Sequence, residues 1–217
     1  MTLSVAIRPY AIGDQSAVRE IVCDTADHGE PVERFFRDRD AFADFMTVYY
    51  TDHEPQSLWV AEDAGCVVGY LTGCLNSHRY QRVMLWRVMP HALLRAVQRG
   101  ALWSGETWRM LWAGFRTWIR GGFERHRVLA RYPAHVHINL RKGFRGRAVG
   151  PRLMQCFIEQ ARAAGVRGIH ASVSGSNLPA RRFFERMGFT AVGRHPVIRP
   201  DATAGQLAVT ITYGKTL

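Results

Sequence analysis

The sequence predicts a single α/β domain, residues 1–217, in which helices layer against a mixed central sheet and a helical hairpin is inserted at about 78–131. Two observations lead to this prediction. Strand-like apolar runs alternate with segments of helical periodicity in the first 75 residues, and again from residue 134 onward. The stretch between them differs in composition, with 11 arginines, two acidic residues and five of the six tryptophans.

The first 75 residues predict a strand, two helices and a β-hairpin. Apolar residues at helical spacing follow Asp14, which suits an N-cap. In the next helix, Phe42, Phe45 and Met46 share one face. Two apolar runs then flank a tight link at residues 63–65, which is typical of a hairpin. The expected ranges are strand 3–8, helices 14–28 and 39–50, and strands 57–63 and 66–75.

The insertion predicts two amphipathic helices, at roughly 83–99 and 105–119, joined by a turn at 100–105. Its tryptophans and arginines suit an anionic membrane surface, or the phosphates and bases of nucleic acid. Apolar stripes more often mark packing. We therefore expect the hairpin to pack against the sheet or a second subunit. A homodimer and a membrane contact through 78–131 stay open, and nucleic acid is the less favoured partner.

From residue 134 onward, strands and helices alternate again. Pro151 suits the first turn of a helix, where its missing N–H costs nothing, and Gly165 suits the exit of the same helix. A second helix ends at Gly188. The expected ranges are strands 134–140 and 168–174, helices 151–165 and 178–187, and strands near 189–194 and 206–213.

Charge is distributed unevenly along the chain. Residues 14–63 hold 13 of the 18 acidic residues, whereas residues 1–63 hold only 5 of the 29 lysines and arginines. The basic remainder suits a polyanionic partner such as a CoA nucleotide, nucleic acid or an anionic membrane. The four cysteines form no C-x-x-C pair and have no histidine at zinc-ligand spacing, so we expect no metal. The start of the chain lacks a secretory pattern, so a cytoplasmic location is expected.

The strongest functional signal is a strand, a basic glycine loop and a helix in direct succession, spanning residues 137–154. Backbone N–H groups at a helix N-terminus bind anions, and Gly146 and Gly150 allow close approach of phosphate oxygens. Neither a Walker loop nor a G-x-G-x-x-G fingerprint is present. The segment therefore indicates a pyrophosphate site, with an ordinary turn and a solvated basic rim as the alternative.

This segment resembles the GNAT superfamily of N-acetyltransferases. The family's pyrophosphate motif, R/Q-x-x-G-x-G/A, corresponds to residues 145–150, with Ala148 at the usual first glycine. An alanine suits this position if the backbone there needs no positive φ. A second motif, S-x-S-x-N-x-x-A-x-x-F-F-E-x-x-G-F, runs from Ser172 to Phe189.

The resemblance covers about 134–190 by motif and 3–75 by element order, and it does not cover 78–131. More narrowly, residues 21–38 and 132–140 resemble bacterial proteins similar to the acetyltransferase-like domain of O-GlcNAcase.

The resemblance implies acetyl-CoA as co-substrate and an amine as acceptor, either a small molecule or a peptide. In the family an asparagine at position 177 touches the CoA arm, although an asparagine there also suits a helix cap. Phe184 stands where the family often has a tyrosine that protonates the leaving thiolate. The implied coenzyme-binding residues are Leu140, Lys142, Arg145, Gly146, Arg147, Ala148, Val149, Gly150, Arg152, Asn177 and Phe184.

Acetyl transfer by direct attack needs a base for the amine and a donor that polarises the thioester carbonyl. The resemblance assigns the donor to the backbone amide of Leu140. His135 and His137 alternate along the strand and face one way, so either one can serve as the base, or both can merely pack. Asp27 belongs to a polar cluster with Asp24, His28 and Glu30 that can hold a cationic acceptor or form a solvated helix end.

The favoured function is therefore an N-acyltransferase that uses acetyl-CoA. Two alternatives remain: a non-catalytic CoA-binding protein, suggested by Phe184 and Ala148, and a basic protein that binds nucleic acid or a membrane surface, suggested by the insertion.

Overall fold

A computed structural model of the chain describes residues 5–98, 126–197 and 208–217, together with four helical residues at 105, 108, 112 and 116. Most of the predicted helix at 105–119, and the predicted turn before it, lie outside this described part. No helix within the described ranges is long and apolar enough to cross a lipid bilayer.

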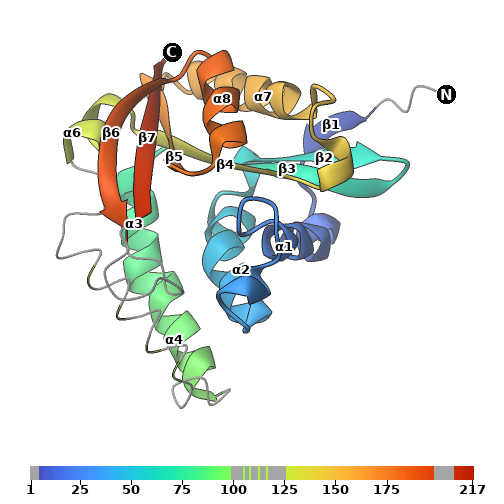
Figure 1. Cartoon of the computed structure of the whole chain (residues 1–217), viewed down its shortest axis with the longest axis vertical. Helices are drawn as coiled ribbons and strands as arrows, with labels where there is room; N and C mark the ends of the chain where they lie inside the picture. Colours follow the sequence, from blue (N-terminus) through green and yellow to red (C-terminus); the bar gives the residue numbers. More distant parts are fainter. Residues whose placement is uncertain are drawn as a thin grey trace.

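The described strands form one mixed seven-stranded sheet in the order β1-β2-β3-β4-β5-β7-β6 (Figure 1). Every neighbouring pair is antiparallel except β4 and β5, which are parallel. The mixed α/β layer sandwich predicted from the sequence is thereby confirmed. The strands are β1 (Ala6–Pro9), β2 (Leu58–Asp63), β3 (Cys66–Cys74), β4 (Ala134–Leu140), β5 (Gly168–Ser174), β6 (Thr190–Val197) and β7 (Ala208–Thr216).

Helices cover both faces of the sheet: α1 and α2 lie on one side, and α7 and α8 on the other (Figure 1). A further helical segment, α3 followed by α4, extends from the sheet on the side of α1 and α2, and Met84 and Val88 of this segment belong to the core there. The α-helices whose bounds the structure describes are α1 (Gln15–Asp24), α2 (Arg39–Val48), α3 (Ser77–Val83), α4 (Met89–Gln98), α6 (His126–Arg131), α7 (Val149–Ala163) and α8 (Leu178–Arg186), and a π-helical stretch, Met84–Val88, joins α3 to α4.

Three local expectations are corrected by the side-chain contacts and exposures in the structure. Asp14 precedes α1, but its carboxylate accepts from the backbone N–H of Ala11 and pairs with Arg8 at 2.7 Å instead of capping the helix. The helix expected from residue 83 begins at Ser77, because the Asn76 side chain caps it. Phe45 is 40% exposed and is not part of the buried face of α2.

Each face of the sheet has its own hydrophobic core. Residues of α7 and α8 pack on one face, and Gly73 of β3 allows this close approach, because a Cβ there would overlap the ring of Phe157. Residues of α1 and α2 form the core on the other face. Strand β4 contributes to both sides, since Val136 belongs to the first core whereas His135 and His137 face Tyr50 on the second.

The central strands diverge soon after they meet. β4 and β5 pair only through Ala134 with Ile169 and His135 with His170. Beyond these pairs β4 stays bound to β3 as far as Leu140, and β5 stays bound to β7 as far as Ser174. A gap therefore opens between β4 and β5, next to the start of α7.

The residue that precedes α7 has an unfavourable backbone conformation. Ala148 is the N-cap of α7 and adopts φ 57° and ψ 10°, in the left-handed region. The condition under which an alanine suits this place, a backbone with no positive φ, is therefore not met. For a residue with a Cβ, this conformation costs roughly 1–2 kcal/mol.

We predict that Ala148→Gly raises the free energy of unfolding by about 0.5–1 kcal/mol, because the strain relieved exceeds the added entropy of the unfolded chain. The control is Ala163→Gly, an exposed position in the last turn of the same helix, where the substitution relieves no left-handed strain and should lower stability. Urea denaturation at constant m-value measures both. Destabilisation by Ala148→Gly would contradict the strain at this residue.

Candidate functional site

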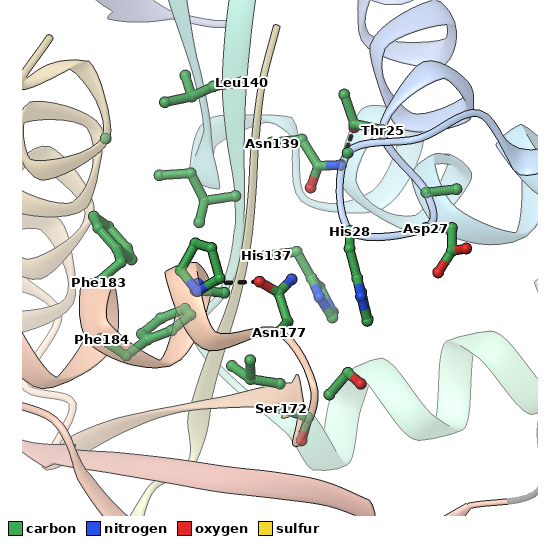
Figure 2. A pocket seen from close by; sticks show the side chains of 18 of the residues that line it. Thr25, Asp27, His28, His137, Asn139, Leu140, Ser172, Asn177, Phe183 and Phe184 are labelled. Atoms are coloured by element: carbon green, nitrogen blue, oxygen red, sulfur yellow. Dashed lines mark hydrogen bonds between the residues drawn. The ribbon is translucent and has the colours of Figure 1, made fainter. Parts of the chain in front are cut away.

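A cavity of about 860 Å³ occupies the divergence between β4 and β5 and is lined from both faces of the sheet (Figure 2). This volume is in the range typical of ligand sites. The turn after α1 and part of α2 form one wall, and the start of α7 with the start of α8 forms the opposite one. Lining residues come from the segments 22–29, 35–46, 136–140, 172–174 and 177–186, from positions 145, 146, 148, 150 and 151 of the loop and the start of α7, and from Val197, Ala208 and Thr210 of β6 and β7.

The glycine loop reaches the cavity through its backbone. Gly146, Ala148 and Gly150 line the cavity, together with Arg145. Gly150 lies close under the Phe183 ring and the Leu140 side chain, since a Cβ there would meet them at 3.2 and 3.6 Å. N–H groups of the first turn of α7 and the positive end of its dipole thus lie at one wall, an arrangement that binds phosphate.

The four other loop residues named from the sequence do not line the cavity. The ammonium of Lys142 pairs with Glu30 at 2.7 Å, and the guanidinium of Arg147 lies over the Phe144 ring at 5.5 Å. Val149 is buried in the core. Arg152 donates to the backbone carbonyl of Val5 at 2.7 Å, so its side chain connects α7 to the region of β1.

The second motif contributes Asn177 and Phe184 to the cavity. The side-chain oxygen of Asn177 accepts from the backbone N–H of Ala180 at 3.1 Å, so this residue caps α8. The Phe184 ring is 4% exposed and stacks with Tyr213 at 6.1 Å between ring centroids. Its surroundings are thus those of a packed aromatic ring that also closes the cavity.

On the face of the sheet covered by α1 and α2, several polar side chains line the cavity. Asn139 donates from its amide to the hydroxyl of Thr25. Asp27 and His28 lie in a tight turn in which His28 has φ 56°, and the carboxylate of Asp27 is 3.7 Å from the Arg34 guanidinium. In Figure 2 the imidazoles of His28 and His137 extend into the cavity between Asn139 and Ser172.

The two histidines considered as bases have different surroundings. His137 lines the cavity, whereas His135 is 7% exposed beneath it. The Ser77 hydroxyl donates to the carbonyl of Pro133, so its oxygen is left to accept from Nδ1–H of His135 at 2.8 Å. Nε2 then accepts from the Tyr50 hydroxyl at 2.8 Å. Both ring nitrogens of His135 are therefore used in holding β4 to the neighbouring elements.

Burial sets the protonation of His135. Desolvation, followed by repulsion from His137 and His170, holds the pKa of His135 well below its usual value of 6.5. A neutral, fully hydrogen-bonded imidazole suits a structural role, and His137 is the better placed of the two for proton transfer.

The polar cluster expected after α1 is only partly directed at the cavity. Asp24 pairs with Arg39 at 2.8 Å, and Glu30 pairs with Lys142, while Asp27 and His28 line the cavity. The apolar part of this wall was not predicted as a site. Its residues Val22, Ala26, Phe35, Phe42 and Met46 have the spacing of ordinary core positions, so periodicity alone could not distinguish them.

The comparisons with known proteins agree with this geometry. Residues 116–189 match the family model of the acetyltransferase (GNAT) family. Over 98% of both chains, the structure is similar to that of SsHAT, with 28% identity and a TM-score of 0.72.

Two similar folds contain the coenzyme. One is yncA from Salmonella typhimurium, solved with its cofactor acetyl-CoA, at 15% identity and a TM-score of 0.59 over 99% of this chain and 94% of that chain. The other is a GNAT superfamily phosphinothricin acetyltransferase from Sinorhizobium meliloti in complex with AcCoA, at 16% identity and a TM-score of 0.57 over 98% of this chain and 88% of that chain.

The depressed pKa of His135 predicts a pH-dependent stability. As the pH falls, His135 becomes protonated in the unfolded chain before it does in the folded one. Its contribution to the free energy of unfolding is therefore fully present above about pH 6.5 and is lost below that pH, at up to about 1.4 kcal/mol per pH unit. His135→Gln should flatten this dependence, and His91→Gln, at an exposed histidine, should keep the wild-type slope. Urea denaturation between pH 5 and 8 measures it. Equal slopes for His135→Gln and wild type would contradict the buried, neutral imidazole.

Proposed function

We propose that this chain transfers the acetyl group of acetyl-CoA to an amine by direct attack, a proposal supported by the match of residues 116–189 to the acetyltransferase (GNAT) family and by the similarity of the fold. One observation above all supports this: the cavity between β4 and β5 joins a phosphate-binding wall on one face of the sheet to a histidine on the other. Such a passage lets two substrates meet without a covalent enzyme intermediate.

The diphosphate of acetyl-CoA is assigned to the first turn of α7. Gly146, Ala148 and Gly150 line the cavity at this turn, and the helix dipole favours negative charge there. Arg145 lines the same wall, and Lys142 and Arg147 add positive charge on the rim. Asn177 and Phe184 then bound the channel for the pantetheine arm.

The reaction needs one base and one hydrogen-bond donor. The neutral amine nitrogen attacks the thioester carbonyl carbon, and the carbonyl oxygen is stabilised by the backbone amide of Leu140. His137 takes the proton that the nitrogen loses, directly or through water, and Asp27 lies at the same wall to attract the cationic acceptor. The C–S bond breaks, and the thiolate takes its proton from water, because Phe184 has no hydroxyl to give.

A non-catalytic CoA-binding protein is the second candidate. The observation that favours it is the apolar, stacked surrounding of Phe184 at the place of the family's usual tyrosine. Acetyl-CoA binding without thiol release in the presence of amines would select this candidate over the enzyme.

Loss of the proposed base should lower the rate without loss of the fold. His137→Ala is expected to reduce thiol release from acetyl-CoA about 10²–10⁴-fold, as is usual when a general base is removed. His91→Ala, an exposed histidine on α4, is the matched control and should keep the wild-type rate. Thiol release is followed with a chromogenic disulfide. An unchanged rate for His137→Ala would exclude this residue as the base.

Charge reversal in the loop should weaken acetyl-CoA binding. Arg145→Glu is expected to raise the Kd for acetyl-CoA by tenfold or more, because Arg145 lines the wall assigned to the diphosphate and the change puts a carboxylate there. Arg162→Glu makes the same change of charge in the last turn of α7 and should alter the Kd less than twofold. Isothermal calorimetry measures both. Equal Kd values for the two variants would contradict the diphosphate assignment.

A further inference from the structure

The wall of the cavity formed by α1 and α2 is mainly apolar. It belongs to the edge of the core between these helices and the sheet. Phe35 and Phe42 meet edge to face, with centroids 5.8 Å apart, and Phe42 is 8% exposed. The cavity-lining members of this apolar wall are Val22, Ala26, Phe35, Phe42 and Met46.

The polar groups of this wall lie where the turn after α1 meets β4. Thr25 and Asn139 bond to each other. Asp27, His28 and His137 complete the polar end. The Asp27 carboxylate lies 3.7 Å from the guanidinium of Arg34, whose side chain is 60% exposed, so water weakens this pair.

From this division we infer that the acceptor is a primary amine carried on an apolar, aryl or alkyl, body. Its nitrogen lies at Asp27, His28 and His137, and its body packs on Phe35 and the rest of the apolar wall. The inference rests on the proposed function and names the substrate class of the same site.

The chemistry of the wall disfavours more polar acceptors. A sugar amine or polyamine would place hydroxyl or ammonium groups against aromatic and aliphatic side chains, where they find no hydrogen-bond partner, and such burial is costly. An aryl or alkyl group instead removes apolar surface of both partners from water. The wall therefore selects among amines by the group attached to the nitrogen.

A panel of amines tests this selection. We would compare 2-phenylethylamine with 2-aminoethanol, which presents the same primary amine on the same two-carbon linker, and with glucosamine. Thiol release from acetyl-CoA by the full chain should give kcat/KM about 10- to 100-fold higher for 2-phenylethylamine than for either polar amine. Equal values, or higher values for a polar amine, would overturn the inference and leave the proposed function standing.

Variants locate the preference at the wall. Phe35→Ala should lower kcat/KM for 2-phenylethylamine about tenfold, mainly through KM, and leave the value for 2-aminoethanol within twofold. Phe35→Leu should restore most of the loss. Ile12→Ala, at an apolar residue that is 74% exposed and does not line the cavity, is the control and should change neither value. If Phe35→Ala lowers kcat/KM for both amines by the same factor, the wall does not select the acceptor.

Two further measurements keep the test decisive. Met46→Ala repeats the comparison if circular dichroism shows that Phe35→Ala is misfolded. If no amine is acetylated although acetyl-CoA binds, the proposed function fails, and calorimetric titration of 2-phenylethylamine into the chain saturated with CoA then tests the pocket alone. Binding at least tenfold tighter than that of 2-aminoethanol would support the apolar amine site, and no such difference would overturn it.

Discussion

The short pairing of β4 with β5 is the constraint on which the site depends. Only two residue pairs join these strands, whereas β3 pairs with β4 from His135 to Leu140 and β7 pairs with β5 over its full length. The sheet can therefore stay open in its middle without losing its order, because each diverging strand keeps one complete ladder of hydrogen bonds. The open segment provides a cavity inside the sheet, where most folds would have hydrogen-bonded backbone.

The opening also separates two kinds of chemistry. On the face of α7 and α8, a basic loop and a helix N-terminus favour a phosphate group. On the face of α1 and α2, His137 lines the cavity, and His135 beneath it is hydrogen-bonded to Tyr50 and Ser77. A buried, neutral His135 orients the strand without taking up a proton, and the imidazole two residues later is presented to the cavity.

Contacts across the gap connect these two halves. Lys142 of the loop pairs with Glu30 of the turn after α1, and the guanidinium of Arg145 packs directly over Gly29, where a Cβ would overlap it. The conformations of this turn and the loop are both unusual, with positive φ at His28 and Ala148. Strain of this kind persists where surrounding contacts hold it, and it often occurs at functional sites.

Local patterns in the sequence determined the strands and helices around the site. The predicted bounds of β4 and β5 agree with the structure, and the glycine loop lies between β4 and α7 as expected. These features could be predicted because the spacing of apolar residues and the preferences of turn residues act over a few neighbouring positions. Tertiary structure alone decided which of His135 and His137 reaches the cavity. Both side chains lie on the same face of β4, but β5 pairs with the strand at His135 and has diverged from it by His137. It also decided that Phe35, Phe42 and Met46 line a cavity while Phe45 is exposed, since packing of distant segments, not spacing, sets which apolar side chains are covered.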